Sequence, residues 1–216
     1  IMTQSTEINR GESSGTLMLD PSELIDYTDR RWAEFRQDLW PEKLRVTGKT
    51  AVSRHGAYVQ DEIPVPLLNP YGTTMLTAGI AFFDDGRAAV TTMIGDVWIV
   101  SGLDADLDEV VWKRFATGLN HGLGVEIIDG KIIVLGRDRL TRLHDFNDDG
   151  CADFYENFSQ AFEPSHGGHS FYVGLQKDRE NNLYFTASTH TVKVSADGKT
   201  ATQLNAGGPV SYTHLT

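Results

Sequence analysis

The sequence predicts a mainly β fold: an incomplete β-propeller of about three blades, preceded by a short helical or irregular N-terminal segment. From Leu76 onward, short β-rich runs alternate with turns of Gly, Asp and Asn, and no helical periodicity interrupts them. Three stretches, beginning at Ala78, Leu123 and Val173, also share one order of glycine, strand, turn, strand, turn and strand. Because one such sheet cannot bury both of its faces alone, repetition every 45–50 residues or so indicates propeller blades.

A closed propeller needs at least four blades, so the three repeats predict only part of one. A β-sandwich is the alternative, but sandwiches do not normally carry this repeat. We expect an N-terminal segment over residues 1–59, the partial propeller over 60–208, and a disordered or artefactual tail over 209–216. The final letters SYTHLT resemble translated sequencing adaptor, and the first residue is not Met. We therefore expect a sequence truncated at both ends.

The N-terminal segment contains one predicted amphipathic helix over about residues 21–40. Asp20 can cap this helix, Pro21 suits its first turn, and apolar residues recur at helical spacing as far as Leu39. Packing of the helix on its own domain is favoured over docking to a partner. Residues 60–72 contain three prolines and no helical period, which predicts an extended connector.

The composition excludes several classes of function. The formal net charge is −11, which argues against a nucleic-acid or anionic-membrane partner because both require a basic face. The single cysteine, Cys151, cannot form an intrachain disulfide. No apolar run reaches the length of about 18 residues that a membrane-spanning helix needs, so no membrane span is expected in this chain.

The stretch DFNDDGCADFYE, residues 145–156, matches the calcium-loop pattern D-x-[DN]-x-[DN]-G-x5-E. Calcium takes six to eight hard oxygen ligands, alternate residues project their side chains inward, and Gly150 permits the sharp turn. The seventh position contributes only its backbone carbonyl, so a cysteine is tolerated there. The predicted ligands are Asp145, Asn147, Asp149, Cys151, Asp153 and Glu156.

A solvated acidic turn is the alternative interpretation of this loop, although the full pattern with its terminal Glu156 rarely arises by chance. An EF-hand would need a helix on each side. Here the preceding residues, DRLTRLH, predict a strand, and Pro164 follows soon after. We therefore expect a structural calcium loop on a β scaffold, where the ion neutralises the clustered carboxylates.

Three stretches carry a family resemblance: NPYGTTMLTAGIAFFDDGRAAVTTMIGDVWIVSG, GLGVEIIDGKIIVLGRDRLTRLHDFNDDGCADFYENF and HSFYVGLQKDRENNLYFTAS. They resemble the propeller region of large sorbosone/glucose-dehydrogenase-like proteins of planctomycetes and verrucomicrobia, which are often called membrane-bound dehydrogenases. The resemblance covers roughly residues 60–208. It implies a six-bladed propeller, export to the periplasm or the extracellular space, and PQQ-linked oxidation of a small-molecule sugar or polyol. It also implies a cytochrome domain in the full-length protein, although this chain has no CxxCH motif.

In quinoprotein sugar dehydrogenases a histidine is the general base and basic residues hold the carboxylates of the quinone. The resemblance therefore suggests His169 and then His121 as catalytic candidates, because each lies on a loop that enters a repeat. Arg137 and Asp138 are the candidates for cofactor binding. The alternatives are locally satisfied histidines, a transition metal at H166-G-G-H169, and a salt bridge between blades for Arg137 and Asp138.

Two functions from different classes follow. The first is a PQQ-dependent type of sugar or polyol dehydrogenase that passes electrons to a cytochrome, of which this chain is a fragment that we expect to be inactive by itself. The second is a non-catalytic propeller that binds a glycan or a protein. No G-x-S-x-G, P-loop, H-E-x-x-H or G-x-G-x-x-G motif points to another chemistry.

Overall fold

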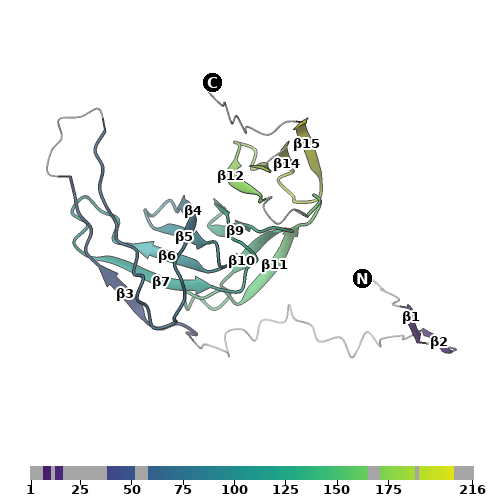
Figure 1. The fold of residues 1–216 in the computed structure, drawn as a ribbon, viewed down its shortest axis with the longest axis horizontal. Helices are drawn as coiled ribbons and strands as arrows, with labels where there is room; N and C mark the ends of the chain where they lie inside the picture. The colour runs from purple at the N-terminus through teal and green to yellow at the C-terminus, as the bar shows by residue number, and fades with distance from the viewer. Residues whose placement is uncertain are drawn as a thin grey trace, which may run out of the picture.

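The computed structural model describes residues 7–10, 13–16, 38–51, 58–164, 171–187 and 190–206. Most of the predicted helix (21–37) and the predicted tail (209–216) lie outside these ranges, and residues 38–40 are irregular. The described residues contain only β-strands as regular elements (Figure 1). They include a two-stranded hairpin of β1 (Glu7–Arg10) and β2 (Ser13–Thr16).

Three antiparallel sheets follow, and in each one strands that are consecutive in the chain lie side by side. The first sheet has the order β3-β7-β6-β5-β4, the second β11-β10-β9-β8 and the third β12-β13-β14-β15. Their strands are β3 (Lys43–Val46), β4 (Thr77–Phe82), β5 (Ala88–Thr92), β6 (Val97–Ser101), β7 (Val110–Ala116), β8 (Gly124–Ile128), β9 (Lys131–Leu135), β10 (Leu140–His144), β11 (Phe154–Ser159), β12 (Val173–Lys177), β13 (Leu183–Thr186), β14 (His190–Val194) and β15 (Ala201–Ala206).

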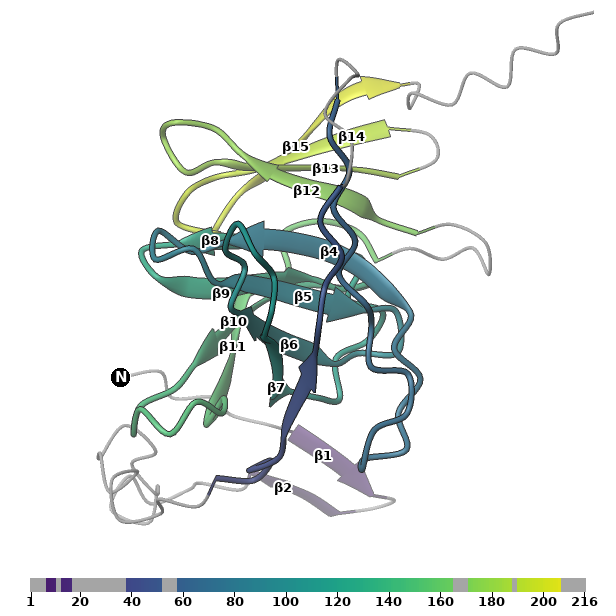
Figure 2. The same ribbon diagram turned by 90° about the vertical axis from the view of Figure 1, so that its left-hand side faces the viewer.

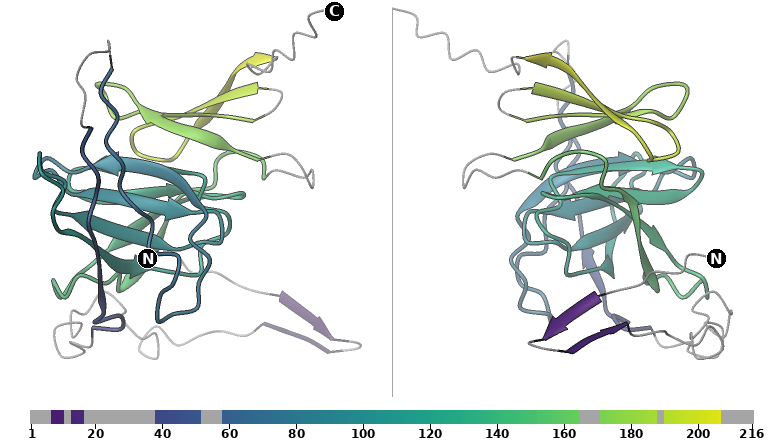
Figure 3. Two further views of the ribbon diagram at one scale, coloured as in Figure 1. Left: turned by 60° about the vertical axis from the view of Figure 1, so that its left-hand side comes forward. Right: turned by 90° about the vertical axis from the view of Figure 1, so that its right-hand side faces the viewer.

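The three four-stranded meanders are arranged as blades, which we number 1 to 3 in chain order. Their first strands, β4, β8 and β12, lie next to one another, and the later strands splay away from them (Figures 2 and 3). This arrangement confirms the predicted incomplete propeller. Blade 1 also gains a fifth, outer strand: β3, from the predicted N-terminal segment, pairs with β7.

Repeated glycines allow the first strands to approach closely. A Cβ atom at Gly79 would lie 3.2 Å from the Cα of Gly124, and a Cβ at Gly124 would lie 2.7 Å from the Cβ of Leu175. A larger side chain at either position would therefore push neighbouring blades apart. The glycine that opens each repeat is thus a requirement of blade packing.

Apolar side chains fill both interfaces between blades. One cluster joins blades 1 and 2 through residues such as Val97, Phe115 and Val134, and a second joins blades 2 and 3 through residues such as Leu135 and Phe185. A third cluster lies on the other face of blade 1, around the fully buried Trp98. The connector, through Val65 and Tyr71, packs against this third cluster in place of a blade.

The GDVW stretch of blade 1 holds a buried ion pair. Asp96 is 2% exposed and its carboxylate pairs with the guanidinium of Arg114, which is 12% exposed. The hydroxyls of Thr73 and Thr117 each donate to the same carboxylate at 2.6 Å. Three separate segments, the connector, β7 and the loop after β7, are therefore tied to one buried aspartate.

The same arginine also contacts the segment before the propeller. Its guanidinium carbon lies 5.3 Å from the ring centre of Trp40 and 5.1 Å from that of Tyr71. The Tyr71 hydroxyl donates to Glu42 at 2.8 Å. These cation–π contacts stabilise the docking of residues 40–42 on blade 1.

Within the described ranges, the structure has no helix that is long and apolar enough to cross a membrane.

Candidate functional site

The blades have two ends, and each carries candidate residues. We call the end with the connection 117–123 and the turn 136–139 of blade 2 the upper end. The opposite end, with the turn at 129–130 and the loop 145–153, is the lower end. The strand directions place the predicted catalytic residues at the upper end and the acidic loop at the lower end.

His121 and Arg137 come together at the upper end. The His121 ring centre lies 5.5 Å from that of Phe171, and the guanidinium carbon of Arg137 lies 5.3 Å from the same Phe171 ring. The backbone N–H of Arg137 donates to the carbonyl of Asn120 at 3.1 Å, which links the two loops. We call His121, Arg137 and Phe171 the upper cluster.

Two features of His121 are unusual for a residue with only a structural role. Its φ is +55°, a conformation that non-glycine residues rarely adopt and that often marks functional sites. Its Nδ1 atom is buried and has no hydrogen-bond partner in the described part of the chain. His169, the first predicted catalytic residue, lies outside the described residues, as does His166.

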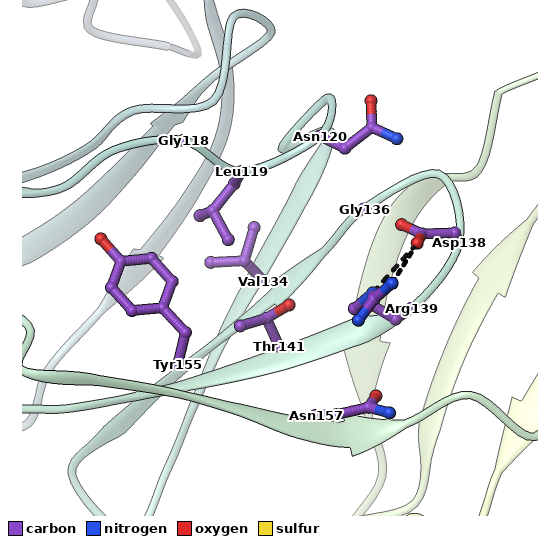
Figure 4. Close-up of a pocket in the computed structure, with 10 residues that line it drawn as sticks. All are labelled: Gly118, Leu119, Asn120, Val134, Gly136, Asp138, Arg139, Thr141, Tyr155 and Asn157. Carbon is purple, nitrogen blue, oxygen red and sulfur yellow. Dashed lines mark hydrogen bonds and ion pairs between the residues drawn. The ribbon is translucent and has the colours of Figure 1, made fainter. Parts of the chain in front are cut away.

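A pocket of about 280 Å³ lies beside this cluster (Figure 4). Asn120 and Asp138, the sequence neighbours of His121 and Arg137, line it together with Tyr155 and Asn157. Asp138 accepts hydrogen bonds from Nε and Nη2 of Arg139 at 3.0 and 2.7 Å. The structure therefore separates the two predicted cofactor-binding residues: Arg137 belongs to the upper cluster, and Asp138 pairs with Arg139 at the pocket wall.

Sequence reasoning did not select Glu126, in the middle of β8. Burial raises the pKa of its carboxyl, and the ammonium of Lys177, 3.9 Å away, partly offsets that rise. An ionisable, partly buried group on the first strand of a blade is a candidate for proton transfer. Its position at the centre of the strand that follows His121 was the available sequence signal.

The acidic loop connects β10 to β11 at the lower end of blade 2, as predicted. Its side chains accept hydrogen bonds from its own backbone: Asn147 Oδ1 from the N–H of Asp149 at 2.9 Å, and Asp149 Oδ1 from the N–H of Cys151 at 2.8 Å. Asp145 Oδ2 accepts from the N–H of Gly150 at 2.8 Å. These bonds curl the loop around its acidic side chains.

Asp145 has an oxygen that fits a role as a cation ligand. Its Oδ1 atom is buried and has no hydrogen-bond partner within the described residues. Burial raises the pKa of the Asp145 carboxyl, and the charges of Asp149 and Asp153 raise it further, although the bond from Gly150 opposes the rise. A bound cation would relieve both causes.

Other predicted ligands have different partners. Asp153 accepts from the N–H of Phe146 at 2.6 Å, inside the loop. Glu156 lies in β11 opposite Arg142, and its Oε2 is 2.7 Å from His144 Nε2 and 3.4 Å from Arg142 Nη1. No group of three or more His, Cys, Asp and Glu side chains among the described residues is arranged to hold a metal ion. The residues thus fit a cation at the start of the loop, whereas Glu156 would have to leave two cationic neighbours to join it.

A lysine already compensates part of the charge of the loop. Lys113 Nζ donates to the carbonyl of Asp149 at 2.7 Å and lies 3.0 Å from a carboxylate oxygen of Asp38. The thiol of Cys151 is buried and donates to Asp38 at 3.2 Å. Burial and this aspartate raise the pKa of Cys151 to about 12, so the thiol is protonated at neutral pH.

The sheets and their order define a protein of the β-propeller class. No family model and no curated protein matches the chain. Three solved structures are similar to it. Virginiamycin B lyase from Staphylococcus aureus has 15% identity over 64% of this chain and 44% of that one, with a TM-score of 0.43. A streptogramin B lyase has 16% identity over 60% and 40%, with a TM-score of 0.42. A protein of unknown function from Bacteroides caccae has 15% identity over 60% and 44%, with a TM-score of 0.35. The chain thus spans less than half the length of each.

Proposed function

We propose that this chain is part of a calcium-binding β-propeller in an exported sugar or polyol dehydrogenase of the quinoprotein type, which acts in the periplasm or outside the cell and passes electrons to a cytochrome. The observation that supports this proposal is the upper cluster. It brings a histidine with a strained backbone and an arginine to one aromatic ring, at the end of the blades where connections enter the first strands.

The upper cluster has the groups that this reaction needs. The imidazole of His121 has an unperturbed pKa near neutrality and is suited to take the proton from a sugar hydroxyl. The guanidinium of Arg137 is suited to hold a carboxylate, and Phe171 offers a flat apolar surface. PQQ, when bound, would accept the electrons that the substrate loses. The segment that contains His169 immediately precedes Phe171 in the chain.

Binding of PQQ tests this proposal without requiring turnover by a partial propeller. We expect quenching of tryptophan fluorescence by PQQ to saturate, and Arg137→Gln to weaken the affinity about tenfold or more, because a charge-assisted contact is lost. Lys199→Gln is the matched control, since Lys199 is an exposed cation on blade 3. Equal affinities for the wild type and both variants would remove Arg137 from the site, and absence of quenching would remove PQQ.

The pocket beside the cluster supports a second candidate function, a non-catalytic propeller that binds a glycan. Its walls carry amide, carboxylate, guanidinium and phenol groups from Asn120, Asp138, Arg139 and Tyr155, which suit recognition of sugar hydroxyls, and His121 is not among them. Its volume of about 280 Å³ lies just below the usual range for small ligands. Retention on immobilised glycans that Asn157→Ala abolishes, without PQQ binding, would favour this function.

We also propose that the acidic loop binds calcium through Asp145, Asn147, Asp149 and the carbonyl of Cys151. The buried free oxygen of Asp145 supports this assignment. The ion would have a structural role, because it would neutralise carboxylates on the loop that connects β10 to β11. Asp153 and Glu156 remain predicted ligands, and Glu156 would join the shell only by exchanging Arg142 and His144 for the ion.

The substitution Asp145→Asn is expected to change the melting temperature in opposite directions with and without calcium. A carboxyl whose pKa is raised by folding lowers stability once pH exceeds that pKa, so at pH 7 in EGTA the Asn variant should melt at or above the wild-type temperature. In millimolar calcium the wild type should gain stability, by about 2.7 kcal/mol at a calcium concentration 100 times Kd, and the variant should gain less.

Two controls accompany this measurement. Asp84→Asn changes an exposed turn residue on blade 1 and should respond to calcium as the wild type does. Cys151→Ser should keep its calcium affinity, because only the backbone carbonyl of Cys151 is a predicted ligand. A wild-type melting temperature that is the same in calcium and in EGTA would contradict the proposed calcium site.

A further inference from the structure

A second cavity lies between blades 1 and 2 at their lower end, away from the upper cluster. Its volume is about 600 Å³, within the usual range for small-molecule sites. Strands β3, β6 and β7 of blade 1 form one wall, and the β9 and β10 ends of blade 2 form the other. We call this cavity the lower cleft.

The floor of the lower cleft is apolar. Ile99 and Phe115 come from blade 1, and Ile132 and Leu143 come from blade 2. All four belong to, or pack against, the apolar cluster between the two blades. A ligand with a flat or aliphatic body can therefore extend the packing between the blades.

The rim of the lower cleft is basic. Five cationic side chains line it, against two carboxylates, Asp145 and Asp148, from the acidic loop. Its cations are Lys43, Arg45, Arg87, Lys113 and Lys131. This is unusual in a chain with a net charge of −11, in which acidic residues outnumber Lys and Arg by 30 to 19.

The cations of the rim differ in how they are compensated. Arg45 pairs with Glu109, and Arg87 pairs with Asp85, on the exposed side of the rim. Over the described residues, Lys43 and Lys131 have no ion-pair partner. Two cations at the mouth of an apolar cleft thus remain available to a ligand.

The pairing of β3 with β7 sharpens this argument. Lys43 lies directly opposite Lys113 across the two strands. Like charges in directly opposite positions destabilise a sheet. Lys113 is compensated by Asp38 and by the carbonyl of Asp149, whereas nothing described compensates Lys43. An anion that enters the cleft would remove this repulsion.

We propose that the lower cleft binds an organic anion, in which a carboxylate, sulfonate or phosphate group is attached to an apolar or aromatic body. Lys43 and Lys131 hold the anionic group, with Lys113 close by. Ile99, Phe115, Ile132 and Leu143 receive the body. This site is separate from the upper cluster and does not depend on the proposed dehydrogenase activity.

The probe for this site is 8-anilino-1-naphthalenesulfonate, and its matched control is the uncharged N-phenyl-1-naphthylamine. Both are titrated by fluorescence in EGTA, so that the result does not depend on cation binding by the acidic loop. We expect one saturable sulfonate site, and about fivefold weaker binding for Lys43→Gln and for Lys131→Gln, because each removes one Coulombic contact with the anion. Lys199→Gln should leave the affinity unchanged, and melting curves verify that each variant is folded.

Binding that rises with ionic strength, or that is equal for the two probes, would show that the cleft recognises apolar surface alone and would overturn the anion site. Equal sulfonate affinity in the wild type and both lysine variants would also overturn it. A loss of affinity confined to Lys43→Gln and Lys131→Gln, together with weak binding of the naphthylamine, supports the proposal.

Discussion

Replacing Asp96 by Ala is expected to lower the free energy of unfolding by about 3–5 kcal/mol, the cost of breaking a buried ion pair from one side. The substitution leaves the guanidinium of Arg114 in a site where only 12% of its surface reaches water. It also removes the acceptor for the hydroxyls of Thr73 and Thr117. Urea unfolding, followed by tryptophan fluorescence, measures the loss.

Asp85→Ala is the matched control for Asp96→Ala. Asp85 pairs with Arg87 on the surface, where half of each side chain is exposed, so its loss should cost less than about 1 kcal/mol. The double variant Asp96→Ala/Arg114→Met should recover part of the lost stability, because no buried charge remains unpaired. Equal losses for Asp96→Ala and Asp85→Ala would show that the buried network is not a main support of blade 1.

The strands were predictable because they depend on local pattern. Runs such as V97-W-I-V100 and K131-I-I-V-L135 became β6 and β9 because their residues favour strands and Gly, Asp and Asn turns flank them. The repeat predicted the blades for a similar reason, since each glycine that opens a repeat marks a close approach between first strands. β3 was not predicted: its four residues, KLRV, carry too little pattern, and its pairing with β7 depends on a partner more than 60 residues away.

The candidate sites were predictable only in part. The topology of a blade repeat places the connection with His121 and the turn with Arg137 at one end, so their meeting follows from the fold. The spacing of the acidic loop fixed the positions of Asp145, Asn147 and Asp149 but not that of Glu156. A strand register decides which side chain Glu156 faces, and that register places it opposite Arg142.

The lower cleft shows the same limit of sequence reasoning more strongly. Lys43 and Lys113 lie 70 residues apart in the chain, and only the pairing of β3 with β7 sets them opposite each other. A charge pattern read along the chain therefore gives no sign of a basic cleft in an acidic protein. Local pattern predicts elements, whereas cross-strand register creates the charge arrangement that a ligand would meet.

The substitution Gly95→Ala is expected to destabilise blade 1 by roughly 3–5 kcal/mol, the sum of backbone strain and overpacking. Gly95 has a φ of +99°, and a Cβ atom there would lie 1.9 Å from the carbonyl oxygen of Leu119, with two more backbone atoms of Leu119 within 3 Å. The N–H of Leu119 also donates to the carbonyl of Gly95 at 3.1 Å. The turn before Asp96 and the connection that leads to His121 would therefore have to separate.

Gly86→Ala isolates the strain from the collision. Gly86 has a similar φ of +86° in the neighbouring turn, but a Cβ atom there would meet nothing within 4 Å, so its cost should be only the strain of about 1–2 kcal/mol. Because residue 119 leads to the upper cluster, Gly95→Ala should also weaken PQQ binding, whereas Gly86→Ala should not. If the two variants unfold at the same urea concentration, the contact of Gly95 with Leu119 does not constrain the upper end of the blades.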